Sequence, residues 1–248
     1  MRWKRLISSV SIVAFAASGS SFQAMAADGQ FFDPGSIYIR GDAGVALGRD
    51  DTGVIGDLIS PDDTVDFDFG KSPSFGLGVG FYVNDYIRTD VTAQYMTRFD
   101  LTGLYTDNGL LLPNSTTSVD LDSATIMLSG YLEVRPLLGE IGPFNPYIGG
   151  GIGISRNKLG TFTVSDPAVG TSTISGDTNI DLAWKITAGT GIKLTGSVML
   201  DLSYSYLDLG EASSSRSAVD VGVPGQLREP LRFDVRMHTL MLGVRYFF

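Results

Sequence analysis

Regular alternation of apolar side chains is the feature of this sequence that most constrains its fold. It is clearest in the last nine residues, where every second side chain is apolar: Leu240, Leu242, Val244, Tyr246 and Phe248. The positions between them include Gly243 and Arg245. Because successive side chains of a β-strand point to opposite faces, this stretch predicts a strand with one apolar face and one mixed face.

Eight stretches of the chain show this alternation. They cover residues 37–47, 74–83, 87–97, 123–134, 147–155, 180–192, 198–206 and 240–248. Each is close to the roughly 9–11 residues that a tilted strand needs to cross a bilayer. No stretch after residue 26 is apolar over the roughly 18 residues that indicate a membrane-spanning helix.

The connections between these stretches alternate in length. Short ones fall at residues 84–85, 135–144 and 193–196, and long ones fall near 48–73, 98–122, 156–179 and 207–237. Short turns at one rim and long loops at the other, around an even number of strands, are typical of outer-membrane barrels. The sequence therefore predicts an all-β fold: an eight-stranded antiparallel up-and-down transmembrane β-barrel with short periplasmic turns and long extracellular loops.

Charged side chains occupy only one of the two faces that the alternation defines. That face is also rich in glycine, for example Gly76, Gly78 and Gly80. The interior of an eight-stranded barrel is just wide enough for side chains, so a crowded interior favours glycine. We therefore expect the apolar face to contact lipid and the charged face to line the lumen. The predicted lumen charge network consists of Arg40, Asp42, Arg88, Asp90, Arg98, Glu133, Asp181, Lys185, Asp201 and Arg245.

Two interpretations of these charges are open. Five of the residues are basic and five are acidic, so they can neutralise one another and plug the lumen, since buried charges must be paired. Alternatively, they can line a narrow porin-like channel for small solutes. The small bore of an eight-stranded barrel favours the plug.

The first residues predict export. Arg2, Lys4 and Arg5 precede a mostly apolar run, and residues 24–26 read Ala-Met-Ala, which is typical of a secretory signal peptide. We expect a signal peptide at residues 1–26 that is cleaved after Ala26, a short periplasmic lead at 27–36 and an outer-membrane β-barrel domain at 37–248. Cleavage removes three basic residues and no acidic ones, so the formal net charge changes from -9 to -12. This acidic balance argues against a nucleic-acid partner.

The composition also restricts the chemistry. The chain has no Cys and one His, which excludes disulfides, thiolate metal sites and clusters of His ligands. Carboxylates of the acidic first loop, at residues 50–68, are an open alternative as a Ca²⁺ site, but their spacing matches no known cation loop, so we expect no metal site and no cofactor. A lipid A-modifying enzyme needs a nucleophile, a base and an orienting acid that converge. His238 has no nucleophile at a defined spacing, so we expect no catalytic residues, and this activity is the weakest alternative.

Arg236 and His238 continue the lipid-facing parity of the last strand beyond its apolar set. That strand is expected to descend from the outside, which places both side chains at the level of the outer-leaflet headgroups. A guanidinium matches the geometry of lipopolysaccharide phosphates. We therefore expect a lipopolysaccharide contact at Arg236 and His238, and rim charges that face water are the open alternative.

Four segments carry a resemblance to a known family. They read Asn-Pro-Tyr-Ile-Gly-Gly-Gly-Ile-Gly at 145–153, Leu-Ala-Trp at 182–184, Tyr-Ser-Tyr-Leu-Asp-Leu-Gly at 204–210 and Leu-Gly-Val-Arg-Tyr-Phe-Phe at 242–248. The chain resembles the small outer-membrane β-barrel proteins of Gram-negative bacteria related to the OmpA transmembrane domain and OmpX. Within these it is most similar to the alphaproteobacterial porin-family surface antigens.

The resemblance implies a fold and a cellular location more firmly than an activity. It implies a location in the cell outer membrane. From the whole pattern we expect a monomer in contact with lipid and lipopolysaccharide, with a structural or surface-interaction role that is adhesin-like or antigen-like. The resemblance also implies handling by periplasmic chaperones and the barrel assembly machinery. The predicted assembly signal consists of Leu242, Val244, Tyr246 and Phe248.

Overall fold

The computed structural model describes residues 35–49, 51–55, 63–107, 110–111, 116–138, 142–167 and 170–248. The predicted signal peptide and nearly all of the predicted periplasmic lead lie outside these residues, as does the side chain of Arg98. Within the described part of the chain, no helix is long and apolar enough to cross a membrane.

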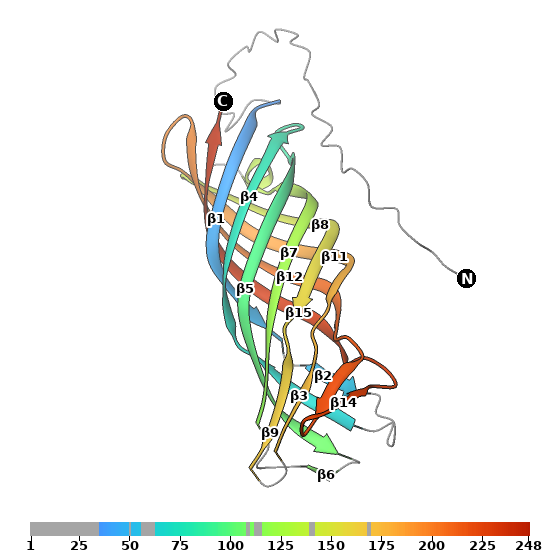
Figure 1. The fold of residues 1–248 in the computed structure, drawn as a ribbon. Coiled ribbons are helices and arrows are strands. Elements are labelled where there is room, and N and C mark those ends of the chain that lie inside the picture. Colours follow the sequence, from blue (N-terminus) through green and yellow to red (C-terminus); the bar gives the residue numbers. More distant parts are fainter. Residues whose placement is uncertain are drawn as a thin grey trace, which may run out of the picture. The chain divides into compact units, whose positions relative to one another are not determined.

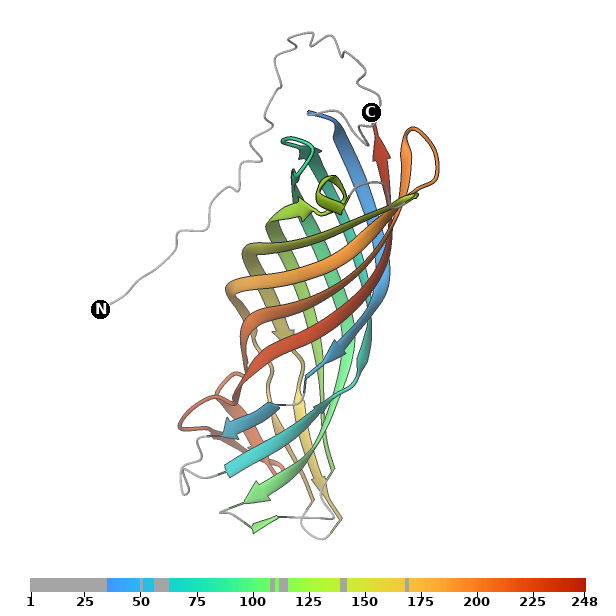
Figure 2. The ribbon, with the colours of Figure 1, turned by 180° about the vertical axis from the view of Figure 1, so that it is seen from behind.

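Long antiparallel strands form the wall of a barrel. They are β1 (Ile37–Gly48), β4 (Lys71–Tyr82), β5 (Ile87–Asp107), β7 (Thr116–Glu133), β8 (Phe144–Leu159), β11 (Thr178–Lys193), β12 (Val198–Ser213) and β15 (Arg232–Phe247). Each pairs with the next along the chain, and β15 pairs back with β1, which closes the ring (Figure 1). Seen from behind, β15 (red) crosses the wall that faces the viewer as a continuous strand (Figure 2). The predicted all-β, antiparallel, up-and-down barrel is confirmed.

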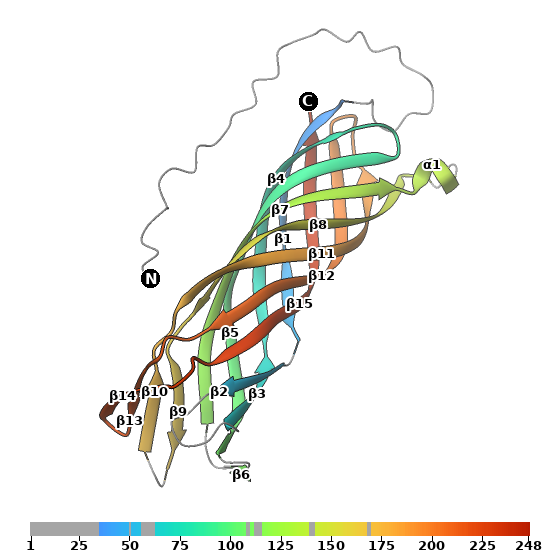
Figure 3. The same ribbon diagram turned by 90° about the vertical axis from the view of Figure 1, so that its right-hand side faces the viewer.

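Short strands extend one end of the barrel. They are β2 (Asp51–Ile55), β3 (Asp63–Phe69), β6 (Leu110–Leu111), β9 (Phe162–Asp166), β10 (Gly170–Ile174), β13 (Ser217–Asp220) and β14 (Val223–Gln226). The four-residue helix α1 (Arg135–Leu138) and the C-terminus lie at the other end (Figure 3). We call these the long-loop half and the short-turn half.

The long connections contain much more strand than the sequence indicated. Residues 98–122 were expected to form a loop, but β5 and β7 continue through most of this range and pair as far as Gly103 and Thr117. In addition, β2 and β3 insert between β15 and β5, while β9, β10, β13 and β14 continue from the edge of β7. The predicted loop at 98–122 is therefore wrong, because the alternation continues there with its faces exchanged.

This exchange of faces is visible along β7. In the short-turn half, Ile126 and Leu128 are each 56% exposed, whereas the hydroxyl-bearing Thr125 is buried. In the long-loop half, Leu121 is buried and Asp120 is exposed. The expected apolar exterior is thus confirmed for the short-turn half, whereas the long-loop half has the polar exterior and apolar interior of a water-soluble barrel.

An apolar core fills the interior of the long-loop half. Aromatic packing contributes to it, since Phe69 of β3 and Phe233 of β15 meet edge to face with ring centroids 5.7 Å apart. Phe99 of β5 and Phe162 of β9 are fully buried in the same cluster. The lumen therefore contains an apolar layer that the charge pattern did not predict.

Phe99→Ala tests this core. Phe99 is 0% exposed, so truncation should lower the free energy of unfolding by about 3–5 kcal/mol. Val223→Ala in β14 is the control, because Val223 is 67% exposed and its truncation should change stability by less than about 0.5 kcal/mol. Urea titration of the refolded protein measures both, and equal stabilities would show that the apolar interior does not support the barrel.

Candidate functional site

A network of buried charges crosses the lumen of the short-turn half. Its side chains are at most 8% exposed and come from β1, β5, β7, β12 and β15. Regular strand pairing brings them together, because each occupies an inward position of its strand. We call this set the lumen network: Arg40, Asp42, Arg88, Asp90, Glu133, Asp201 and Arg245.

Arg88 lies at the centre of the network. Its Nε donates to Oε1 of Glu133 at 2.5 Å, and its Nη1 lies 3.4 Å from Oδ2 of Asp90. The guanidinium carbon also lies 3.8 Å from the ring centre of Tyr131 and 4.4 Å from that of Tyr147. Carboxylates therefore hold the edge of the guanidinium while aromatic rings hold its faces, which fixes this cation in place.

Arg40 binds two carboxylates. Its Nε and Nη2 donate to the two oxygens of Asp42 at 2.8 and 2.7 Å, which is a bidentate pair. Its Nη1 donates to Oδ2 of Asp90 at 3.1 Å. Asp90 therefore joins Arg40 to Arg88, and the ion pairs form one connected group on β1 and β5.

Arg245 connects the opposite wall to this group. It forms an ion pair with Asp201 of β12 and donates to the hydroxyl of Tyr82 on β4 at 3.0 Å. Tyr82 in turn donates to Oε1 of Glu133 at 3.2 Å. Since β1 separates β4 from β15 in the ring, these bonds pass across the interior and not only along neighbouring strands.

Four inward tyrosines complete the network, and the charge pattern did not single them out. Tyr147 donates to Oδ1 of Asp201 at 2.5 Å, and Tyr38 donates to Oδ2 of Asp90 at 3.2 Å. Tyr131 donates to Oδ1 of Asp90 at 3.3 Å. A signal was present in the sequence, because Tyr38, Tyr82, Tyr131 and Tyr147 occupy the parity of the charged residues.

Three predicted members do not join these ion pairs. Asp181 accepts hydrogen bonds from the backbone N–H groups of Leu182 at 2.7 Å and Glu211 at 3.0 Å, so it fixes the rim of β12. Lys185 is buried, but among the described residues it makes neither an ion pair nor a hydrogen bond. The side chain of Arg98 lies outside the described part of the molecule.

A small polar cavity separates the lumen network from the apolar core. Its volume is about 30 Å³, which is sufficient for a water molecule. Arg40 and Lys185 line it together with hydroxyl groups of β11, β12 and β15, namely Thr187, Ser203, Ser205 and Thr239. From the short turns outward, the lumen thus holds an ionic layer, a polar cavity and an apolar layer.

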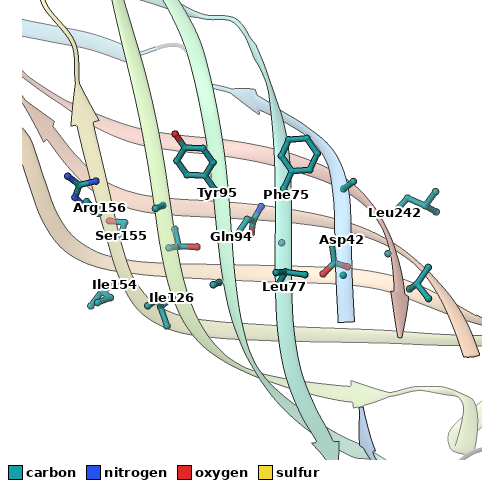
Figure 4. Close-up of a pocket in the computed structure, with 18 of the residues that line it drawn as sticks. Asp42, Phe75, Leu77, Gln94, Tyr95, Ile126, Ile154, Ser155, Arg156 and Leu242 are labelled. Carbon is teal, nitrogen blue, oxygen red and sulfur yellow. The ribbon is translucent and has the colours of Figure 1, made fainter. Parts of the chain in front are cut away.

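The outer wall carries a larger hollow of about 1010 Å³. Figure 4 shows its lining, in which exposed apolar side chains such as Phe75 and Leu77 alternate with inward polar ones such as Asp42 and Gln94. The lining comes from all eight long strands, with apolar side chains on the outward face and polar ones on the inward face, so this volume follows the wall around the barrel and is not a single cleft.

The rim residues Arg236 and His238 face outward on β15, and both have protein partners. Arg236 lies 3.2 Å from Oδ2 of Asp208 and 2.6 Å from Oδ2 of Asp234. Nδ1 of His238 lies 2.7 Å from the hydroxyl of Tyr204, and the two rings are stacked. These contacts fix the orientation of both side chains. Among the described residues, the imidazole of His238 has no hydrogen bond to a serine, a threonine or a carboxylate, which a catalytic triad would need.

Comparison with known proteins identifies the barrel. The family model described as outer membrane protein beta-barrel domain matches residues 13–248. The chain belongs to this family. The predicted resemblance to small outer-membrane β-barrel proteins is confirmed, and membership supports a location of this barrel in the outer membrane.

Two sequence relatives and one solved structure are similar to this chain over most of its length. An uncharacterized protein of Brucella abortus (strain 2308) is 29% identical over 252 residues, covering 85% of this chain and 84% of the relative. A candidate adhesin of Rickettsia prowazekii (strain Madrid E) is 24% identical over 212 residues, covering 84% and 86%. The outer membrane protein OprG from Pseudomonas aeruginosa has a TM-score of 0.55 at 18% identity, covering 88% of this chain and 98% of OprG, which shows the shared fold.

Arg88→Met tests the lumen network. The substitution leaves Glu133 without its buried cation and leaves Asp90 with Arg40 alone, so it should lower the free energy of unfolding by about 3–5 kcal/mol. Lys185→Met is the matched control, because it removes a buried cation that has no direct ion pair, and its effect should be clearly smaller. In a double-mutant cycle, Arg88→Met and Glu133→Gln should cost less together than the sum of the single effects. Additive effects would show that the side chains of Arg88 and Glu133 have no stabilising interaction energy.

Proposed function

We propose that this protein is an integral outer-membrane barrel whose filled lumen is a structural plug and whose long-loop half makes adhesin-like contacts at the cell surface. The observation that carries the proposal is the exchange of polarity between the two halves of one closed wall. A filled lumen leaves the outer surfaces as the places where a partner can bind. The likeness to a candidate adhesin of Rickettsia prowazekii supports a role in attachment.

The exchange of polarity supports a membrane position for the eight long strands. In the short-turn half, the exposed face consists of large apolar side chains, among them Leu77 at 71% and Leu182 at 67% exposure. Exposed apolar surface of this extent is unfavourable in water and is satisfied by lipid. The short turns then face the periplasm, and the strand-rich long-loop half projects from the cell.

Aromatic side chains at the edge of this apolar face nearest the long-loop half support the same position. Trp184 and Tyr206 pack with ring centroids 5.6 Å apart, and Tyr204 stacks on His238. Tyr and Trp are enriched at membrane interfaces because one end of the side chain is apolar and the other can hydrogen-bond with water or headgroups. Asp208 of β12 faces Trp184 in the strand register, so the first outward acid of β12 is at this edge.

The contents of the lumen favour the plug over the channel. Ion pairs and tyrosine hydroxyls cross the short-turn half, and an apolar core occupies the long-loop half. A continuous path for solutes would have to pass both layers, and the cavity between them has a volume of only about 30 Å³.

Surface display tests the adhesin-like role. The full chain expressed in a non-adherent Gram-negative host should raise attachment to animal cell monolayers several-fold. A variant with the β9–β10 and β13–β14 hairpins shortened should lose this gain because it lacks the outermost strands. Leu137→Ser in α1 at the opposite rim is the control and should attach like the parent. All strains are matched for barrel level in the outer membrane. Attachment of the parent at the level of the empty host would contradict the adhesin-like role.

The end of β15 provides a second test, which concerns assembly. Tyr246 and Phe248 are exposed and pack edge to face at 5.3 Å, so their rings form an outward apolar patch. We propose that this patch, with Leu242 and Val244, is read by the barrel assembly machinery after delivery by periplasmic chaperones. Converting Tyr246 and Phe248 to Ser should reduce folded barrel in the outer membrane and raise unfolded precursor in the periplasm. Normal heat-modifiable migration of the variant on gels would contradict the proposed signal.

A further inference from the structure

Two exposed basic side chains lie on β8 at the edge of the apolar face nearest the long-loop half. Arg156 and Lys158 follow the outward apolar series Ile148, Ile152 and Ile154 on the same face of the strand. We propose that Arg156 and Lys158 bind a phosphate group of a glycolipid in the outer leaflet and thereby hold the barrel at a fixed depth. This inference rests on the proposed membrane position, and it names a lipid site on a wall that the sequence did not single out.

Apolar surface surrounds Arg156. Its register partners are Ala124 on β7 and Ile180 on β11, and Ile180 is 68% exposed. On its own strand, Ile154 precedes it on the same face and is 54% exposed. The guanidinium is therefore flanked on three sides by the surface that contacts lipid, and a cation at the edge of hydrocarbon is stabilised when an anion reaches it.

Within the described part of the chain, no carboxylate neutralises either cation through an ion pair. Among the residues that the structure describes, Arg156 and Lys158 form no ion pair and no side-chain hydrogen bond. Asp122 faces Lys158 in the strand register and accepts a hydrogen bond from Thr97 at Oδ1 over 2.9 Å, but no ion pair joins Asp122 to Lys158. The two basic groups are therefore available to an external ligand.

The contrast with Arg236 explains why this site is favoured over the predicted one. Arg236 uses Nε for Asp208 and Nη2 for Asp234, so two carboxylates already compensate its charge. A phosphate approaching Arg236 would meet both acids. At Arg156 and Lys158 the same phosphate meets two cations and one facing acid, Asp122, so the local charge stays positive. A guanidinium can also bind two phosphate oxygens at once.

The position of the site selects a lipid phosphate over a dissolved one. An inorganic phosphate would contact two flexible side chains at an open surface, where solvent and salt weaken the attraction. A lipid phosphate is held at the level of Arg156 because its acyl chains pack on the apolar face between Arg156 and the short turns. Burial of the chains and pairing of the charges then act on one ligand.

The test measures how lipid A protects the folded barrel against heat. The full chain is reconstituted into phosphatidylcholine vesicles with or without bisphosphorylated lipid A, and the melting temperature is recorded for each. Lipid A should raise the melting temperature of the parent. The double variant Arg156→Ala, Lys158→Ala should lose most of this rise while melting like the parent in phosphatidylcholine alone.

Two variants control for charge and for the alternative site. Arg216→Ala, Arg228→Ala removes the same charge from exposed positions of the long-loop half and should keep the rise. Arg236→Ala should also keep it. Loss of the rise in Arg236→Ala, with retention in the Arg156 and Lys158 double variant, would overturn the inference and assign the lipid contact to Arg236.

Two ligand controls identify the source of the phosphate. Dephosphorylated lipid A and inorganic phosphate should each give little of the rise, and full protection by either would overturn the inference. A parent protein that inserts into the vesicles but gains nothing from bisphosphorylated lipid A would overturn it as well. Insertion is scored separately by heat-modifiable migration in phosphatidylcholine alone, so failure of the proposed membrane position is distinguishable from failure of this site.

Discussion

The narrow lumen of the closed barrel is the constraint on which the rest of the structure depends. Inward side chains from opposite walls meet in it, so each inward position must be small, paired or apolar. Gly153 shows how closely the curved wall packs on its inner side, because a Cβ there would collide with the carbonyl oxygen of Ile126 on the neighbouring strand. Arg88 shows the electrostatic limit, because it is fully buried and needs two carboxylates and two aromatic rings as partners. The outer surface is free of these limits and carries the bulky apolar side chains.

The same two-residue period serves two environments along one strand. In β15, the inward side chain is Arg245 near the short turns but Phe233 in the long-loop half. The outward side chain changes in the opposite sense, from Val244 to Arg232. A strand that leaves lipid for water must exchange its faces in this way, since water replaces hydrocarbon outside and the interior must then supply the apolar core.

This exchange also explains what could be predicted from the sequence. The strands in the short-turn half and their faces were predictable, because the alternation and the one-sided charges depend only on local parity. The long-loop half was read as loops because its alternation has the opposite sign, with Leu121 inside and Asp120 outside. The choice of partners within the lumen network was not predictable, since it depends on register between strands distant in sequence. Asp181 departs from the pattern because the pairing of β12 with β15 shifts between Asp208 and Glu211, where Gly210 has a positive φ of 72°.

The lumen network has a second consequence for the specificity of the fold. Ion pairs in a low-dielectric interior contribute little net stability over an apolar filling, because desolvation offsets much of their attraction. They do penalise errors in pairing. A one-residue shift of β5 or β15 would turn Arg88 or Arg245 toward the apolar outer face and would leave Glu133 or Asp201 buried without its cation. Because glycine-rich strands such as β4 specify register weakly through packing, the charges are a physical reason why the wall closes in one register.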